Sequence, residues 1–207
     1  NLFMTNTHHY IMFFTNTGRV YKLKCYEIPE ASRTARGMAI INLLQLQPGE
    51  KITTMVHFAD FDEDRNLIMA TKKGTIKKTP LSAYMNIRKT GIQAITLRDD
   101  DELIEVKVSD CEQNVLMLTK KGQAIKFAEK DIRETGRSAM GVKGITLRNG
   151  DEVVAMQLET QGEYITFVSA NGYGKRNRFT DFKLQNRGGK GVKCYNITDK
   201  TGEVVGV

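Results

Sequence analysis

Short apolar runs that end at a glycine turn recur four times along the chain. Each run is rich in β-branched or aromatic residues and continues, after a turn of the form Ser/Thr-x-x-Gly, into a mixed basic stretch. Two such stretches joined by a glycine turn are typical of a β-hairpin, with the glycine at a positive φ. We therefore predict four hairpins, in the segments YIMFFTNTGRVYKL, LIMATKKGTIKKT, VLMLTKKGQAIKF and YITFVSANGYGKRN, with turns at Gly18, Gly74, Gly122 and Gly172.

A second glycine and two further strands complete each repeat. The glycine is followed by an apolar strand, and an acidic turn then leads into the strand that opens the next repeat. About four short strands in roughly 50 residues predict a propeller-like blade. We expect one all-β domain over residues 1–207, with antiparallel repeats at about 1–48, 49–99, 100–149 and 150–200 and a partial fifth repeat at 201–207. The second glycines are Gly37, Gly91, Gly141 and Gly191.

Composition narrows the class of protein. Of the 207 residues, 40% are hydrophobic, which is enough for a core. The sequence holds no apolar run of 18 residues and no basic segment followed by an apolar one at its start, so we expect neither a transmembrane helix nor a signal peptide. Three separated cysteines, Cys25, Cys111 and Cys194, favour free thiols in a reducing cytosol over a disulfide framework.

Basic residues recur at fixed positions of the repeat. The net charge of +7 favours a polyanionic partner, but many basic proteins bind no polyanion, so the positions of the basic residues must decide. Lysines on an outer strand also protect it from edge-to-edge pairing, and this explanation stays open for part of the pattern. Four residues after the hairpin glycines stand Lys22, Lys78, Lys126 and Arg176, and four before the second glycines stand Arg33, Ile87, Arg137 and Arg187, with Arg88 and Lys89 beside the exception.

The last repeat concentrates this charge around a glycine-rich motif. Between Gly174 and Lys193, seven basic residues face one acid, Asp181, for a local charge of +6, while acids gather in the turns Asp60–Asp64 and Asp99–Glu102. Successive glycines can turn their backbone N–H groups towards one phosphate oxygen, although they can also simply form a tight bend between blades. The motif is Gln185, Asn186, Arg187, Gly188, Gly189, Lys190 and Gly191.

Basic sites repeated once per blade on a ring form a curved belt, which fits duplex DNA. Contacts to phosphates without base readers give weakly sequence-specific, salt-sensitive binding. A curved path bends the DNA at an elastic cost of about 1–6 kcal/mol for an arc of 40–90°, which roughly 6–10 phosphate contacts can offset.

Three long segments closely resemble the C-terminal domain of bacterial DNA gyrase A. They are FFTNTGRVYKLKCYEIPEASRTARGMAIINLL, GRSAMGVKGITL and YGKRNRFTDFKLQNRGGKGVK, and the resemblance extends over essentially all 207 residues. It implies a β-pinwheel, a propeller-like ring of usually six blades that wraps DNA around its rim, so that the ATP-dependent holoenzyme introduces negative supercoils. With about four blades here, we expect the chain to be truncated at both ends.

The resemblance also bears on the glycine-rich motif and on partners. The family has a signature motif, Gln-(Arg/Lys)-Arg-Gly-Gly-(Arg/Lys)-Gly, in its first blade. The motif of this chain lies in a late blade and has Asn186 where the signature has Arg or Lys. We therefore expect Gln185–Gly191 to be a relative of the signature motif without its primary role in wrapping. The implied partners are double-stranded DNA, the rest of gyrase A and the gyrase B protein, in a cytoplasmic, nucleoid-associated enzyme, with no membrane. Charge placement and the resemblance together predict phosphate contacts at Lys22, Arg33, Arg36, Lys77, Lys78, Arg88, Lys89, Lys126, Arg137, Lys143, Lys175, Arg176, Arg178, Arg187, Lys190 and Lys193.

Three other functions remain as alternatives. The first is the equivalent domain of topoisomerase IV, although YEIPEASRTARG is more similar to gyrase. The second is a propeller that binds proteins, which the absence of Trp and the 8% aromatic content disfavour. The third is an enzyme in its own right. We predict no catalytic or metal site, because the adjacent His8 and His9 would point to opposite faces of a strand and His57 is remote. We also predict no cofactor in this domain, since the resemblance implies that the holoenzyme binds ATP and Mg²⁺ in its other parts.

Overall fold

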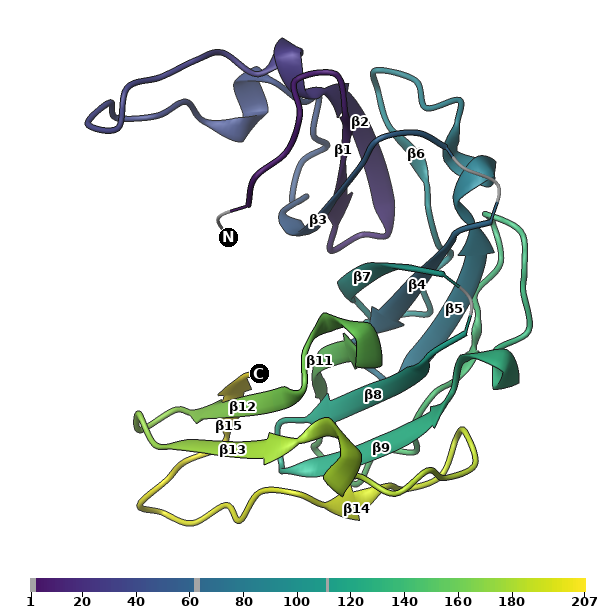
Figure 1. The fold of residues 1–207 in the computed structure, drawn as a ribbon, viewed down its shortest axis with the longest axis vertical. Helices are drawn as coiled ribbons and strands as arrows, with labels where there is room; N and C mark the ends of the chain where they lie inside the picture. The colour runs from purple at the N-terminus through teal and green to yellow at the C-terminus, as the bar shows by residue number, and fades with distance from the viewer. Residues whose placement is uncertain (1–2, 62–63, 111) are drawn as a thin grey trace.

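Four antiparallel β-sheets stand side by side in an arc (Figure 1). The computed structural model describes residues 3–61, 64–110 and 112–207, and within these ranges the chain forms strands and short 3₁₀ turns without an α-helix. The predicted all-β, blade-like architecture is confirmed. The strands are β1 (Tyr10–Thr15), β2 (Arg19–Lys24), β3 (Ile52–Phe58), β4 (Asn66–Thr71), β5 (Thr75–Pro80), β6 (Ile92–Gln93), β7 (Leu103–Ser109), β8 (Asn114–Thr119), β9 (Gln123–Ala128), β10 (Val142–Lys143), β11 (Val153–Leu158), β12 (Tyr164–Ser169), β13 (Gly174–Arg178), β14 (Val192–Lys193) and β15 (Val204–Gly206).

Short 3₁₀ turns follow most of the outer strands. They are η1 (Cys25–Glu27), η2 (Ile40–Asn42), η3 (Leu81–Tyr84), η4 (Glu129–Asp131), η5 (Glu159–Gln161) and η6 (Phe179–Asp181). Four of them, η1, η3, η4 and η6, follow the second strand of a hairpin and lead into the loop that ends at the second glycine, whereas η2 follows Gly37 and η5 lies between β11 and β12.

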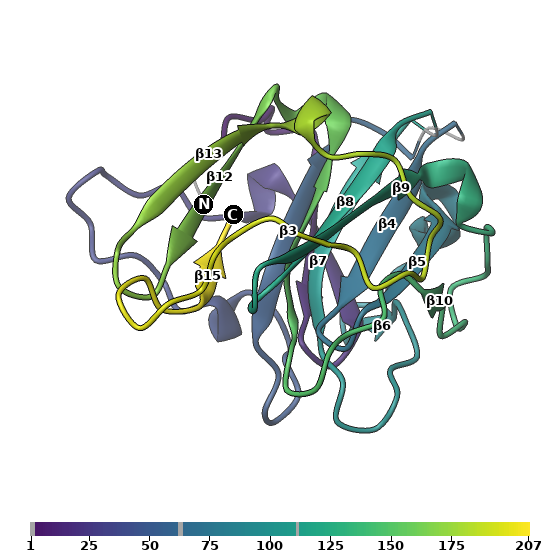
Figure 2. The same ribbon diagram turned by 90° about the horizontal axis from the view of Figure 1, so that it is seen from below.

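Each of the first three sheets is completed by two strands from the following repeat. The first sheet has the order β3-β1-β2-β6, in which β1 and β2 form the predicted hairpin and β3 and β6 come from the second repeat. In the same way β10 pairs with β5, and β14 pairs with β9. The fourth sheet, β13-β12-β15, has three strands, and Figure 2 shows it at one end of the row.

Burial follows from the stacking of the sheets. Every residue of β4 is buried, because the second sheet has a neighbour on each side. In β12 of the last sheet, buried and exposed residues alternate, because one of its faces lacks a neighbouring sheet within the described residues. Separate apolar cores fill the spaces between successive sheets, and a smaller one lies under residues 40–46, which fold over the outer face of the first sheet. In the described part of the chain, no helix is long and apolar enough to span a membrane.

The glycines of consecutive repeats meet at the junctions between sheets. The four hairpin glycines have φ between 77° and 88°, as predicted. A Cβ on Gly18 would lie 2.7 Å from the carbonyl oxygen of Ile95, and a Cβ on Gly141 would lie 2.6 Å from that of Ile76. Both kinds of glycine therefore allow one repeat to approach the backbone of the next, in addition to supplying a positive φ.

The acidic turns hold the hairpins. Asp101 accepts backbone hydrogen bonds from Lys73 and Glu102, and Asp151 accepts the equivalent bonds from Lys121 and Glu152. In the first sheet Glu50 accepts a hydrogen bond of 2.6 Å from the Tyr21 hydroxyl and approaches Arg19 at 3.4 Å. These carboxylates thus stabilise the hairpin turns. The other acidic turn, Asp60–Asp64, lies partly outside the described residues.

Candidate nucleic-acid interface

Four of the exposed predicted cations, Arg88, Lys89, Arg137 and Lys190, lie on the loops between a 3₁₀ turn and the second glycine of the repeat. These loops, at residues 85–91, 132–141 and 182–191, run along the outer side of the arc (Figure 1). Successive sheets thus present equivalent loops to the same side of the molecule. The predicted contacts with exposed side chains are Arg33, Arg36, Arg88, Lys89, Arg137, Lys143, Lys175, Arg176, Arg178, Lys190 and Lys193, while Lys22 and Arg187 are partly exposed.

Three predicted contacts require correction because their side chains are buried. Lys78 and Lys126 are 9% and 8% exposed, and their ammonium groups donate to the carbonyl oxygens of Glu129 and Phe179 in the following repeat. The Lys126 ammonium also lies 5.0 Å from the centre of the Phe179 ring, within range of a cation–π interaction. These members of the hairpin column join one repeat to the next and do not face DNA.

Lys77 is the third buried cation. Its side chain is fully buried, and its Nζ donates to the carbonyl oxygen of Ala94 at 2.7 Å and to that of Arg137. Burial, with a smaller contribution from the positive charge of Arg137, lowers the pKa of Lys77 to about 8. Lys77 therefore ties together segments of the second and third repeats and cannot reach a phosphate.

A groove on the outer side brings together cations from three repeats. It has a volume of about 690 Å³ and is lined by Lys22, Arg88 and Arg137, with the amides Asn86 and Gln93 between them. Lys22 donates to the carbonyl oxygen of Met85, and burial lowers its pKa. Arg88 and Arg137 remain exposed. Two free guanidinium groups beside amide donors are suited to phosphate oxygens, which Arg binds as a planar fork.

The glycine-rich motif packs on the preceding repeat. The Arg187 guanidinium donates to the carbonyl oxygens of Asp131 and Lys143, and the Gly188 N–H donates to that of Gly144. A Cβ on Gly191 would lie 2.5 Å from the carbonyl oxygen of Ala124. The prediction of a phosphate nest is therefore corrected at Gly188, whose amide is already used. The tight bend between blades, the alternative interpretation of these glycines, describes the geometry better.

A second basic groove lies beside the last hairpin. Its volume is about 400 Å³, and Lys175, Lys183 and Lys193 line it. Lys183 was absent from the predicted contacts, although it belongs to the basic segment Gly174–Lys193 whose charge the sequence shows. Cys194 lines the same groove, and burial raises the pKa of its thiol to about 11, so that it stays protonated at neutral pH.

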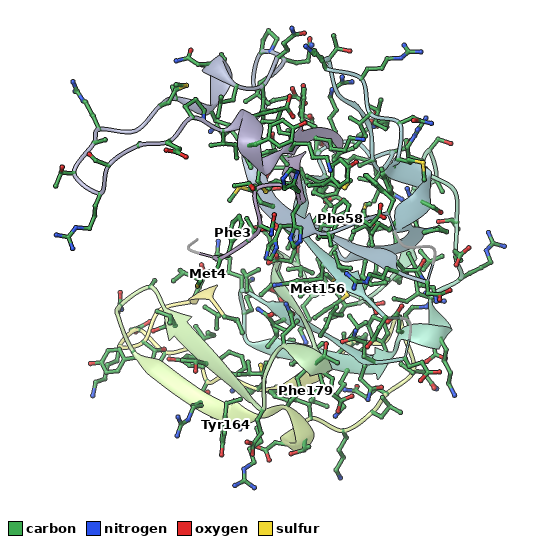
Figure 3. All side chains as sticks on the ribbon, turned by 45° about the horizontal axis from the view of Figure 1, so that its top comes forward. Phe3, Met4, Phe58, Met156, Tyr164 and Phe179 are labelled. Carbon is green, nitrogen blue, oxygen red and sulfur yellow. The ribbon has the colours of Figure 1, made fainter. Side chains whose placement is uncertain are left out.

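The outer strand of the last sheet carries arginines over an aromatic ring. The guanidinium carbons of Arg176 and Arg178 lie 4.7 and 5.9 Å from the centre of the ring of Tyr164, the first residue of β12, which is labelled in Figure 3. Arg178 also lies 3.9 Å from Glu163. Within the described residues, the other ion pairs use Arg19, Lys72, Lys107 and Lys120, none of which is a predicted contact, so acids neutralise little of the basic surface.

Arg33 and Arg36 lie apart from the grooves. They belong to residues 29–39, all of them exposed, which we call the arm and which project from the first sheet on the open side of the arc (Figure 1). The described cysteines, Cys25 and Cys194, are free, and Cys111 lies outside the described residues. Across those residues, His, Cys, Asp and Glu side chains form no group of three that could hold a metal ion.

The family comparison covers most of the chain. A model of the DNA gyrase C-terminal domain, described as a beta-propeller, matches residues 9–57, 65–110, 113–158 and 163–207. The DNA gyrase A protein of Clostridium acetobutylicum is 56% identical over 207 residues, which are 100% of this chain and 25% of that protein. The gyrase A protein of Staphylococcus aureus (strain NCTC 8325) is 44% identical over 97% of this chain and 23% of its own length. The chain thus spans about a quarter of the length of the curated relatives that it matches.

Two solved structures have the same arrangement of strands. The C-terminal domain of a DNA topoisomerase IV superimposes with a TM-score of 0.85 at 27% identity, covering 97% of this chain and 62% of that one. A DNA gyrase A C-terminal domain superimposes with a TM-score of 0.82 at 31% identity, covering 97% of this chain and 65% of the other.

Proposed function

The chain belongs to the DNA gyrase C-terminal domain family, and from this premise we propose that its outer loops bind duplex DNA and bend it along the arc of sheets. The observation that carries the proposal is the groove in which Lys22, Arg88 and Arg137, from three consecutive repeats, lie together on the outer side. Along the outer side of the arc, the loop of each repeat continues the row of cations begun by the loop of the repeat before it. A duplex that follows this path contacts successive repeats through its phosphates.

The charge available on this path fits a bent duplex. Outside the arm, nine of the predicted contacts are exposed and two are partly exposed, so several phosphates can be neutralised at once. Between 50 and 200 mM salt, 6–10 such contacts correspond to a loss of affinity of about 10³–10⁵-fold. Binding of this kind is largely independent of sequence, because contacts to phosphates carry no sequence information.

In the intact protein we propose a role for this chain without chemistry of its own. Its curated relatives are components of DNA gyrase, a type II topoisomerase, and this chain corresponds to about a quarter of the length of such a relative. Strand passage, ATP and Mg²⁺ then belong to the remainder of gyrase A and to the gyrase B protein. The wrapped duplex reaches that machinery with a fixed handedness, which gives negative supercoils. The likeness to topoisomerase IV keeps its equivalent domain as the second candidate.

Binding to a fluorescent duplex of about 150 bp, one persistence length, tests this proposal. We expect tight binding at low salt, weakening steeply as salt rises, with end-to-end energy transfer in shorter duplexes reporting the bend. An affinity for the duplex that does not change with salt concentration contradicts the proposal, as does the absence of binding at low salt. Binding to a protein ligand that survives charge reversal at Arg88 and Arg137 favours the interaction-platform alternative instead.

A further inference from the structure

Lys77 is a buried cation directly behind the wall of the groove of about 690 Å³, which we call the outer groove. Its side chain, on β5, is fully buried, and its Nζ donates to the carbonyl oxygen of Ala94 at 2.7 Å and to that of Arg137. Arg137 lines the groove, and Ala94 follows Gln93, which also lines it. The Lys77 ammonium therefore holds one segment of the second repeat and one of the third from inside the molecule.

The fold does not need a cation at this position of the repeat. Counted three residues after the hairpin glycines, the counterparts of Lys77 in the first and third repeats are Tyr21 and Ile125, which are 1% and 0% exposed. Neutral side chains thus fill the same buried position in the neighbouring repeats. An ammonium that leaves water loses hydration free energy, which its hydrogen bonds must offset. A function at the adjacent groove accounts for the charge of Lys77 better than packing does.

The described neighbours of Lys77 include polar groups but no carboxylate partner. On η3 the Tyr84 hydroxyl donates to the same Ala94 carbonyl at 2.8 Å, and burial raises the pKa of Tyr84, so this hydroxyl remains protonated. On one side of β5 the cross-strand partner is Met69 of β4, and on the other side β10 carries Lys143, whose side chain is exposed. Within the described residues, no ion pair joins Lys77 to an acid that would fix its charged form.

The charged group that acts on Lys77 is Arg137. Burial, and to a smaller extent the positive charge of Arg137, lower the pKa of Lys77 to about 8. The same guanidinium charge acts on Tyr84, where it opposes the larger effect of burial. A phosphate bound to Arg137 offsets the guanidinium charge with a negative one and raises the pKa of Lys77. Since the two effects are reciprocal, a protonated Lys77 in turn favours phosphate binding.

We propose that Lys77 couples the binding of DNA phosphates in the outer groove to the uptake of a proton, with Arg137 as the link. The inference rests on the proposed function, because it concerns the groove that carries that function. Lys77 is a positioning residue that does not touch DNA, since its side chain is fully buried. Its charged form also donates the stronger hydrogen bond to the Arg137 carbonyl, so protonation holds the backbone of that arginine more firmly.

The sign of the pH dependence follows from this coupling. Lys77 is mostly protonated at pH 7 and mostly neutral at pH 9, on either side of its pKa of about 8. DNA affinity should therefore fall as the pH rises, by about two- to fivefold from pH 7 to pH 9, which is the effect of one phosphate charge about 10 Å from the ammonium. At pH 8 binding should take up about 0.3–0.4 proton per chain.

Affinity and proton uptake are both measurable on the chain itself. Fluorescence anisotropy with a labelled duplex at constant ionic strength gives the affinity, and calorimetry in buffers of different ionisation enthalpy gives the proton uptake. Lys22 lines the groove as well, and burial lowers its pKa, so variants must separate the two lysines. Lys77→Met should lose the change in affinity between pH 7 and pH 9. Arg137→Gln should lose it too, whereas Arg88→Gln, which removes the other groove arginine, should weaken binding and keep it.

A direct titration keeps the test decisive even where Lys77→Met does not fold. In wild type labelled with ¹³C at the lysine Cε, the lysine that titrates near pH 8 should move to a higher pKa when a duplex of about 20 bp is added. A wild-type affinity that is equal at pH 7 and pH 9, or a pKa of Lys77 that DNA leaves unchanged, overturns the inference. So does a pH effect that persists in Lys77→Met or is equal in the two arginine variants. No binding at pH 7 and low salt contradicts the proposed function itself, and this inference with it.

Discussion

Replacing two arginines of the outer groove gives the most direct energetic test of the DNA surface. Arg88 and Arg137 are exposed, come from different repeats and line the same groove of about 690 Å³. The double variant Arg88→Gln/Arg137→Gln keeps hydrogen-bonding side chains but removes two positive charges. The backbone carbonyl of Arg137, which accepts from Lys77, is unaffected, so we expect the fold to persist.

The expected effect follows from counterion release. Each phosphate contact contributes about 0.9 to the slope of log affinity against log salt, so losing two contacts should reduce the slope by about 1.8. Between 50 and 200 mM salt, a fourfold change, the affinity of the wild type should then fall about 12-fold more than that of the variant. Fluorescence anisotropy with one labelled duplex, titrated at several salt concentrations, measures both quantities.

A matched pair of arginines distinguishes this surface from a general effect of net charge. Arg98 and Arg148 stand beside the acidic turns that hold the hairpins, away from the groove. Arg98→Gln/Arg148→Gln changes the net charge by the same amount and should alter the slope by much less. An equal loss of slope in both double variants would refute the assignment of the groove.

Three further predictions concern the junctions between repeats. Since the pKa of Lys77 is about 8 in the folded chain against 10.5 unfolded, the wild type should gain up to about 3 kcal/mol of unfolding free energy over Lys77→Met as pH rises from 8 to 10.5, measured by urea denaturation. Gly141→Ala, with a Cβ placed 2.6 Å from a backbone oxygen, should cost about 2–4 kcal/mol, and Gly37→Ala, with open space, about 1 kcal/mol, in the same assay. Lys126→Met should lower stability by about 1–2 kcal/mol and leave the salt slope of DNA binding unchanged.

Each of these predictions has a result that contradicts it. A stability difference between Lys77→Met and wild type that is independent of pH would show that the Lys77 ammonium is solvated. Equal costs at Gly141 and Gly37 would mean that the close approach between repeats is not a constraint. A lower salt slope in Lys126→Met would show that Lys126 contacts a DNA phosphate.

Local features of the fold were predictable from the sequence. The alternation of apolar runs with Ser/Thr-x-x-Gly turns predicted the hairpins at Gly18, Gly74, Gly122 and Gly172, because turn chemistry and apolar pattern act over a few residues. The completion of each sheet by the next repeat was not predictable. The strands concerned, such as Ile92–Gln93, have two residues, and a period of two cannot be recognised over such a length.

The burial of the lysine column shows a second limit of sequence reasoning. Lys78 and Lys126 recur at one position of the repeat, which suggested a common exposed surface. The following repeat covers their strand, and a backbone carbonyl accepts from each ammonium. A lysine that donates to a backbone carbonyl at a junction has the same spacing as one that faces solvent, so the repeat pattern cannot separate the two. Arg176, in the last repeat, remains exposed because its strand is uncovered.

The central claim is that loop cations of successive repeats guide duplex DNA along a curved path on the outer side of the arc. Religation of a nicked plasmid in the presence of the chain, followed by gel analysis of the topoisomers, measures that path directly. We predict a shift of the topoisomer distribution towards positive writhe, which Arg88→Gln/Arg137→Gln reduces. An unshifted distribution at saturating protein, or a shift towards negative writhe, would contradict the account.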